Sequence, residues 1–224
     1  MDDYLPDHRV CLRQGGIWRL RWFDGPQPYE PLWHAMREYT ARRTVGDPDE
    51  LWCLEHQPVY TLGQAGQLQF LHDTGVIPVV RSDRGGQVTY HGPGQVVLYS
   101  LVDLRRNRLG IRDLVWHLEQ VILDLLEEEG VTGERRVGAP GVYVQGAKVA
   151  ALGLRVRQGC SYHGLSLNVD MDLAPYAGID PCGLTGTPVT HTRALGIVTG
   201  ATLLGERLME KLWYVLQSKG TGMT

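Results

Sequence analysis

The chain lacks the features that mark membrane, secreted and nucleic-acid-binding proteins. No stretch of its 224 residues approaches the ~18 consecutive apolar residues that cross a bilayer. The chain opens with Met1, Asp2 and Asp3, which are acidic where a secretory signal is basic, and no apolar core follows them. The net charge is −3 and no basic run stands out, so there is no electrostatic footprint for a nucleic acid. We therefore expect a cytoplasmic protein with neither a membrane nor a nucleic acid as partner.

Motifs for cofactors and metals are also missing. The glycine-rich residues 84–95 match neither the Walker loop nor Gly-x-Gly-x-x-Gly, so ATP and dinucleotides have no motif support. The four cysteines are scattered without close pairing, as expected of thiols in a cytosolic protein. Cys160, His163, Cys182 and His191 offer a zinc alternative, but structural zinc sites usually show two compact pairs and only the first pair here is compact. We expect no cofactor and no metal.

Lysine is scarce, and one lysine stands alone. Only three of the 22 basic residues are lysines, and Lys148 is the single lysine in the first 210 positions. Arginine does not give up its proton at working pH, whereas lysine can. Residues 146–154 form an apolar run typical of a strand, a setting that lowers the pKa of an ammonium toward catalytic use. Lys148 is therefore a candidate proton acceptor; the alternative is that its isolation is chance.

Residues 84–95, Arg-Gly-Gly-Gln-Val-Thr-Tyr-His-Gly-Pro-Gly-Gln, are the most informative stretch that is present. Glycine lets backbone approach a ligand closely and adopt positive φ, and proline stiffens the exit. The backbone of this stretch carries polar and titratable side chains around a short strand-like centre, residues 88–90. The stretch predicts the wall of a binding site; the alternative is a hairpin with polar decoration.

Cys182 lies between Pro181 and Gly183. A structural cysteine is usually buried within a helix or strand, so this loop context favours a presented, reactive thiol. A cysteine protease with His91 or His163 as partner is an alternative, but no local signature of the known protease families is present.

The pattern of elements indicates an α+β fold. The content is 43% hydrophobic and 21% charged, as in ordinary globular proteins, and strands and helices do not alternate regularly. We expect one domain over residues 1–224, with a larger lobe up to about 137 and smaller elements after it. The predicted strands are 17–23, 51–54, 59–62, 77–80, 96–104, 142–144, 149–156 and 161–169, and the predicted helices follow Pro28 and span 111–129 and 202–217.

Several stretches together resemble the lipoyl(octanoyl) transferases. They are residues 55–63, 84–95, 138–143, 148–154, 162–169 and 181–183, and they occur in the family's order over roughly residues 17–217. Several long motifs in register are far more specific than any one of them. Residues 184–195 match only loosely, so nothing is carried over to them.

The resemblance implies an enzyme and its partners. Such an enzyme moves an octanoyl group from octanoyl-acyl carrier protein to a lysine of lipoyl domains, the first step of endogenous protein lipoylation. The acceptors belong to 2-oxo acid dehydrogenase complexes and to the glycine cleavage H protein. The implied fold is α+β, a mixed-sheet catalytic domain similar to those of biotin– and lipoate–protein ligases.

The resemblance also assigns roles to residues. Cys182 would carry the acyl thioester. Lys148 would tune Cys182, by taking the proton of its thiol or by holding the sulfur as a thiolate. The residues implied to bind the acyl substrate are Arg84, Gly85, Gly86, Gln87, Val88, Thr89, Tyr90, His91, Ala151, Leu152, Gly153, His163, Gly164, Leu165 and Ser166. The sequence leaves open whether His91 or His163 shuttles protons or orients the carbonyl. Two rival functions also stay open: an ATP-dependent lipoate–protein ligase, and a non-catalytic acyl-binding module.

Overall fold

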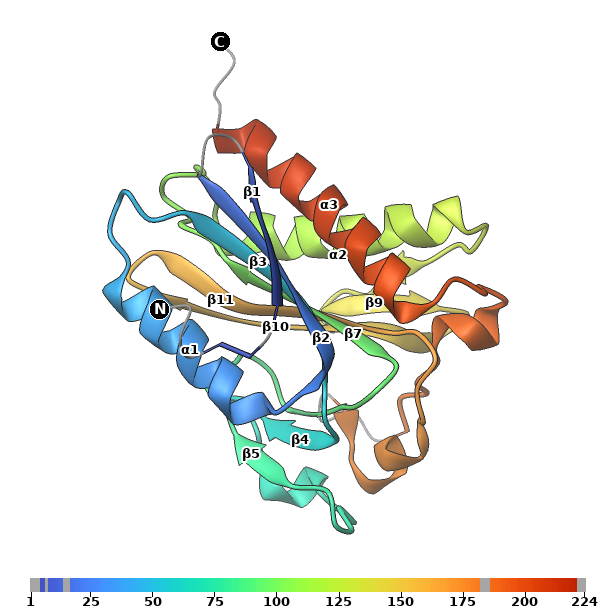
Figure 1. Cartoon of the computed structure of the whole chain (residues 1–224). Coiled ribbons are helices and arrows are strands. Elements are labelled where there is room, and N and C mark those ends of the chain that lie inside the picture. The colour runs from blue at the N-terminus through green and yellow to red at the C-terminus, as the bar shows by residue number, and fades with distance from the viewer. Residues whose placement is uncertain (1–4, 7, 14–16, 182–185, 221–224) are drawn as a thin grey trace.

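An eight-stranded mixed sheet forms the centre of the protein (Figure 1). The computed structural model describes residues 5–6, 8–13, 17–181 and 186–220. The strand order is β1-β2-β3-β7-β11-β10-β9-β8; β2 and β3 pair parallel, and the other neighbours pair antiparallel. The strands are β1 (His8–Arg13), β2 (Trp18–Gln27), β3 (Asp49–His56), β7 (Gln95–Leu101), β8 (Glu134–Arg135), β9 (Gly141–Val144), β10 (Ala147–Arg157) and β11 (Cys160–Asn168).

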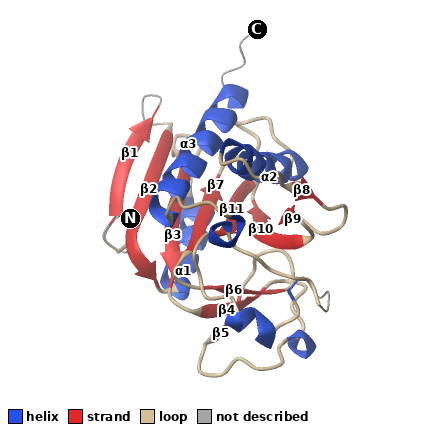
Figure 2. Cartoon of the chain, turned by 90° about the vertical axis from the view of Figure 1, so that its right-hand side faces the viewer, coloured by secondary structure: helices blue, strands red, loops and turns tan. Residues whose placement is uncertain are grey.

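Helices cover both faces of this sheet. Helix α1 (Tyr29–Arg42) lies on one face, and α2 (Ile111–Glu128) and α3 (Ala201–Gly220) lie together on the other (Figures 1 and 2). The apolar stripe of each helix faces the sheet, because residues three and four apart share one side of a helix. Two cores result, a larger one beneath α2 and α3 and a smaller one beneath α1.

A second, three-stranded sheet lies beside the large one, in the order β5-β4-β6 (Figure 2). Its strands are β4 (Val59–Leu62), β5 (Val79–Arg81) and β6 (Val88–His91). A third apolar core, which includes Tyr60, Tyr90 and Ile179, packs it against the turn around the 3₁₀ segment Ala174–Gly178. The residues between β3 and β4, Gln57 and Pro58, therefore carry the chain from one sheet to the other.

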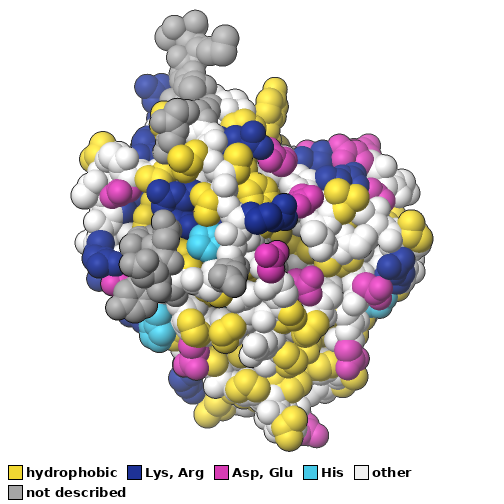
Figure 3. Space-filling model, in the orientation of Figure 1, with side chains coloured by type: hydrophobic (Ala, Val, Ile, Leu, Met, Phe, Trp, Pro, Cys, Tyr) yellow, Lys and Arg dark blue, Asp and Glu magenta, His cyan; other side chains and the backbone are white. Residues whose placement is uncertain are grey.

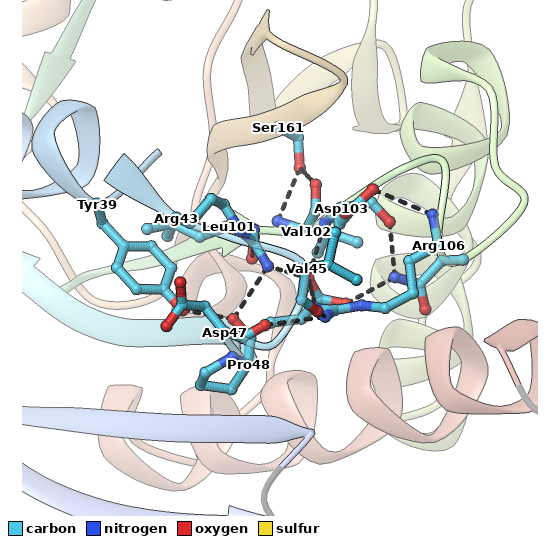
Figure 4. Close-up of polar contacts among 12 residues, drawn as sticks. Tyr39, Arg43, Val45, Asp47, Pro48, Leu101, Val102, Asp103, Arg106 and Ser161 are labelled. Carbon is cyan, nitrogen blue, oxygen red and sulfur yellow. Dashed lines mark hydrogen bonds and ion pairs between the residues drawn. The ribbon is translucent and has the colours of Figure 1, made fainter. Parts of the chain in front are cut away.

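A buried polar network ties α1 to the ends of β3 and β7 (Figure 4). Arg43, just after α1, pairs with Asp49 at 2.7 Å and donates to the carbonyl of Leu101 at 3.2 Å. The Asp49 carboxylate also accepts from the backbone N–H of Asp103 at 2.7 Å and pairs with Arg106. Buried charges are tolerated when they are paired in this way, so the network holds the end of α1 against the ends of the central strands β3 and β7.

Ion pairs hold α3 in place on the outer surface. Arg9 and Arg13 of β1 pair with Glu206 and Glu210 of α3, and positive and negative side chains are intermixed over the upper part of the face in Figure 3. Apolar side chains gather over its lower part, where Figure 1 places the small sheet.

Within the described part of the chain, no helix is long and apolar enough to cross a membrane.

The fold class predicted from sequence, α+β with a mixed sheet, is confirmed, and most elements lie where the pattern places them. Two predicted strands are displaced: 77–80 becomes β5 at Val79–Arg81, and 96–104 ends at Leu101 in β7. The sequence pattern missed β1, whose exposed Val10 and Leu12 alternate with charged or partly exposed residues at the sheet edge. The division into two lobes near residue 137 stays a prediction.

Candidate functional site

One pocket lies where β6 faces β10 and β11. Its volume is about 730 Å³ including its open mouth, within the range of small-molecule sites. Thr89 and His91 of β6 form one wall, and Leu152 and Leu165 of β10 and β11 form another. The lining is mostly apolar with a few polar groups, which suits a ligand with a hydrocarbon chain and one polar end.

Glycines let the pocket walls meet. The N–H of Gly85 donates to the carbonyl of Leu154 on β10 at 2.9 Å. A Cβ on Gly153 would lie 2.8 Å from the carbonyl oxygen of Gly85, and a Cβ on Gly63 would lie 2.2 Å from that of Gly86. Any side chain at Gly153 or Gly63 would push the loop away from the sheet. The close approach that the sequence predicted for this stretch is present.

Arg84 braces this loop from within. Its guanidinium donates to the Thr61 hydroxyl at 2.9 Å, to the Thr61 carbonyl at 2.5 Å and to the Gly85 carbonyl at 2.9 Å. The side chain is buried yet also lines the pocket. Because two of these bonds reach Thr61 of the small sheet and the third reaches the backbone of the loop itself, Arg84 fixes the shape of the wall.

Lys148 lies at the other side of the pocket, buried on β10 with 4% exposure. Its Nζ donates to the carbonyl of Pro140 at 3.2 Å and lies 5.2 Å from the centre of the Tyr143 ring. Its backbone pairs with the segment that follows the undescribed residues: the N–H of Lys148 donates to Pro188 O at 2.8 Å, and the N–H of Thr190 donates to Lys148 O at 3.0 Å.

Cys182 lies outside the described residues, but its described neighbours border this pocket. Pro181, directly before Cys182, lines the pocket together with Lys148. Val189 lines it from the other side and bridges to Lys148. One described residue on each side of Cys182 in the sequence, Pro181 and Val189, therefore lines the pocket that Lys148 also lines.

Three buried histidines lie near one another, and two of them, His91 and His163, line the pocket. His56 and His91 have ring centroids 5.7 Å apart, and Tyr99 lies between His56 and His163, with centroids 5.8 and 6.0 Å away. Burial lowers the pKa of His56 to about 4 and that of His91 to about 3. Burial also lowers the pKa of His163, although Asp83 opposes the shift. All three rings are therefore neutral near pH 7.

Asp83 organises the His163 side of the pocket. Its carboxylate accepts from His163 Nε2 at 3.0 Å, from Trp33 Nε1 at 2.7 Å and from the Tyr162 hydroxyl. Burial favours the neutral acid, but these donors outweigh burial and hold the pKa of Asp83 well below its usual range. Because the carboxylate accepts, His163 carries its proton on Nε2. His163 itself has φ +61°, a conformation that non-glycine residues adopt rarely and that is frequent at functional sites.

The described side chains do not assemble a metal centre. Among residues 5–6, 8–13, 17–181 and 186–220, no group of three or more His, Cys, Asp or Glu is close enough to hold an ion. Cys11, Cys53 and Cys160 are free thiols, and burial raises the pKa of Cys53 to about 12 and also raises that of Cys160, so these last two are poor nucleophiles.

Comparisons with known proteins identify the family. A model of the lipoyl protein ligase A/B catalytic domain matches residues 28–199. An octanoyltransferase of Dechloromonas aromatica is 57% identical over 196 residues, covering 87% of this chain and 95% of that protein. One of Thiobacillus denitrificans is 62% identical over 192 residues, covering 86% and 84%. The chain belongs to the octanoyltransferase family. It is therefore an enzyme that transfers octanoyl groups in protein lipoylation, and the resemblance seen in the sequence is confirmed.

Solved structures show the same fold. A bipartite lipoate protein ligase from Thermoplasma acidophilum superimposes with a TM-score of 0.68 at 13% identity, covering 88% of this chain and 81% of that one. A biotin protein ligase from Aquifex aeolicus superimposes with a TM-score of 0.53 at 12% identity, covering 90% and 71%. The expected likeness of the octanoyltransferase fold to both ligase classes is confirmed at the level of architecture.

The octanoyltransferase pocket brings together most residues predicted from sequence. Gly85 and Tyr90 are outside its lining: Gly85 pairs with β10, and Tyr90 packs in the core of the small sheet. The predicted residues that line the pocket are Arg84, Gly86, Gln87, Val88, Thr89, His91, Lys148, Ala151, Leu152, Gly153, His163, Gly164, Leu165 and Ser166.

Sequence reasoning missed other residues of the lining. They are Tyr29, Val97, Tyr99, Ala150, Asn168, Tyr176, Pro181 and Val189. Asn168 and Pro181 lie inside stretches already singled out, so their motif membership was a usable signal. Tyr99 sits within an apolar strand run and Tyr29 follows Pro28 at a helix start, and neither context separates a pocket residue from a core residue.

Proposed function

We propose that this enzyme takes the octanoyl group from octanoyl-acyl carrier protein onto Cys182 as a thioester and passes it to the acceptor lysine of lipoyl domains. The observation that carries the proposal is the path of the chain: Pro181 and Val189, on the two sides of Cys182, both line the pocket that contains the buried Lys148.

The first half-reaction is a thiol–thioester exchange. Lys148 Nζ takes the proton of the Cys182 thiol, and the thiolate attacks the octanoyl carbonyl. A C–S bond to Cys182 forms, the C–S bond to the carrier protein breaks, and the leaving thiolate takes the proton from Lys148. One thioester replaces another, so no nucleotide is needed to drive the step.

The second half-reaction forms an amide. The lysine amine of the acceptor attacks the Cys182 thioester, the C–N bond forms and the C–S bond breaks. The amine loses a proton and the Cys182 sulfur regains one, with Lys148 as the carrier. Backbone N–H groups of the glycine-rich walls stabilise the oxyanion, a contribution of ~3 kcal/mol for each well-placed donor.

The apolar walls supply binding energy for the acyl chain. An octanoyl group has about six methylenes, and burying them contributes roughly 5 kcal/mol at ~0.8 kcal/mol each. Val97, Leu152 and Leu165 line the pocket and suit such a chain. The predicted acceptors are the lipoyl domains of 2-oxo acid dehydrogenase complexes and the glycine cleavage H protein. A Thermoplasma acidophilum lipoate protein ligase with the same fold is described together with its E2 lipoyl domain. A cytoplasmic location stays a prediction.

Intact-mass spectrometry tests the thioester. Incubating the full chain with octanoyl-acyl carrier protein is expected to add one octanoyl group that hydroxylamine removes. Cys182→Ser is expected to abolish this hydroxylamine-sensitive adduct, and Cys11→Ser, which removes a half-buried thiol elsewhere, is the matched control that keeps it. An unchanged wild-type mass, or transfer by Cys182→Ser that depends on ATP, would favour a binding module or a lipoate–protein ligase.

Lys148→Arg tests the proton-transfer role separately. The variant keeps the positive charge but cannot release its proton. Octanoyl transfer is expected to fall by roughly 100-fold or more, the usual size of a lost general base. A rate close to that of the wild type in a quenched-flow or discontinuous mass assay contradicts the role of Lys148 as a base.

A further inference from the structure

A chain of hydrogen bonds that includes the pocket residues Asn168 and His91 fixes which ring nitrogen of His91 carries the proton. It begins at a backbone carbonyl, which can only accept. Asn168 Nδ2 lies 2.9 Å from Thr190 O, so the amide nitrogen of Asn168 must face Thr190 and its Oδ1 must face the other way.

The next link is Gln95. Asn168 Oδ1 lies 2.9 Å from Gln95 Nε2, so the amide nitrogen of Gln95 donates to it. The same Nε2 lies 3.3 Å from the carbonyl of Tyr90, which independently requires a donor at that position. Gln95 is 0% exposed, so no water competes for its orientation.

The last link is His91. Because Nε2 of Gln95 faces Asn168 and Tyr90, the Gln95 atom that faces His91 is Oε1. The distance from His91 Nδ1 to Gln95 Oε1 is 2.7 Å. An amide oxygen only accepts, so Nδ1 of His91 carries the proton and Nε2 of the neutral ring is bare. No hydrogen-bond partner for Nε2 lies within the part of the chain that the structure describes.

The tautomer limits what His91 can do. Burial and the neighbouring His56 keep the ring neutral, since they lower the pKa of His91 to about 3. A bare nitrogen cannot donate to the acyl carbonyl or to an oxyanion, so His91 is excluded from carbonyl polarisation. It can only accept a hydrogen bond from a proton-bearing group that enters the pocket it lines.

We propose that Gln95 and Asn168 are positioning residues that hold His91 with a bare Nε2, and that this nitrogen accepts a hydrogen bond from the incoming lysine amine. The amine assignment rests on the proposed function, in which Lys148 already serves the Cys182 thiol. In this bond the incoming lysine amine directs one N–H at His91 Nε2. The lone pair of the amine nitrogen is then directed toward the thioester carbon. Thr190, where the chain of bonds starts, also donates its N–H to the backbone carbonyl of Lys148, so this one residue contacts both Asn168 and Lys148.

Nitrogen-15 NMR of histidine-labelled enzyme tests the tautomer without any assay of activity. The His91 signals, assigned by their loss in His91→Gln, are expected to show a protonated Nδ1 and a bare Nε2, the less common neutral form of free histidine. Gln95→Met, nearly equal in size, removes the acceptor and is expected to shift His91 toward a protonated Nε2. Gln95→Glu keeps an oxygen at the same place and is expected to retain the Nδ1 proton. A protonated Nε2 in the wild type, or an unchanged tautomer in Gln95→Met, overturns the proposal.

Half-reaction kinetics test the role of the tautomer. In Gln95→Met, transfer from isolated octanoyl-enzyme to a lipoyl domain is expected to slow roughly tenfold, the loss of about one hydrogen bond, while loading from octanoyl-acyl carrier protein slows less. Asn107→Ala, which truncates a buried amide of the distant Asp49 network, is the control: it lowers stability without shifting the His91 signals. Equal slowing of loading and transfer in Gln95→Met refutes the amine assignment. Failure to form any octanoyl-enzyme would refute the proposed function and leave the NMR result standing.

Discussion

Replacing His56 with glutamine is expected to remove a defined part of the acid sensitivity of this protein. His56 is 0% exposed and makes two hydrogen bonds. Its Nδ1 lies 2.9 Å from the carbonyl of Gln27, so it must donate, and its Nε2 accepts from the Tyr99 hydroxyl at 2.6 Å. A glutamine side chain offers one donor and one acceptor of similar reach, so His56→Gln can keep both bonds without a titrating group.

The sign of the effect follows from the lowered pKa. In the unfolded chain this histidine takes up a proton below about pH 6.5, whereas burial keeps the folded ring neutral until about pH 4. Between those values unfolding takes up a proton, so His56 contributes stability that is fully present above pH 6.5 and is lost as the pH falls toward 4. The two pKa values differ by about 2.5 units, which corresponds to ~3 kcal/mol.

Urea unfolding followed by tryptophan fluorescence at pH 7, 6, 5 and 4 measures this contribution. The wild type is expected to lose ~3 kcal/mol more unfolding free energy than His56→Gln over that range, at most ~1.4 kcal/mol per pH unit. The buried His163 and His91 titrate in both proteins, but His56 helps to lower the pKa of His91, so the measured difference includes the coupling between these two rings. His34→Gln, at an exposed position of α1, is the control and should keep the wild-type slope. Parallel curves for the wild type and His56→Gln would refute the view that this ring is neutral and desolvated.

Gly94→Ala is expected to lower the unfolding free energy by ~2–4 kcal/mol, because φ is +81° and a Cβ would lie 2.1 Å from the carbonyl oxygen of Asp170. Gly130→Ala shares the positive φ of +78° but meets no atom within 4 Å, so it should cost only ~1 kcal/mol; equal losses in denaturant unfolding would contradict the clash. Arg21→Leu removes the 2.7 Å partner of the fully buried Glu50 and leaves Arg19, at 2.9 Å, as its ion-pair partner; the loss is expected to be ~3 kcal/mol. Adding Glu50→Gln to Arg21→Leu should restore part of that loss, and a double variant no more stable than Arg21→Leu alone would argue against a buried charge that Arg19 compensates only in part.

Local patterns in the sequence determined most of the elements. The stripe of apolar residues at helical spacing in 111–129 gave α2, and the apolar runs at 142–144 and 149–156 gave β9 and β10, with turns at Gln145-Gly146 and Gln158-Gly159. These preferences act over a few residues, so the sequence pattern indicates them without knowledge of the tertiary contacts. The lone lysine and the glycine-rich stretch likewise marked the pocket, because their chemistry is carried by residue type and spacing.

Only the tertiary structure decided how these pieces meet. Strands β3 and β4 are separated by two residues yet belong to different sheets, and β2 pairs parallel to β3 across α1. Within residues 84–95, the tertiary structure places His91 in the pocket lining and Tyr90 in the apolar core of the small sheet. The tertiary structure also determines that Nδ1 of His91 carries the proton. His91 bonds to Gln95, and Gln95 bonds to Asn168, which lies 73 positions further along the chain. Strand pairing and hydrogen-bond direction depend on groups far apart along the chain, and local propensity carries no information about them.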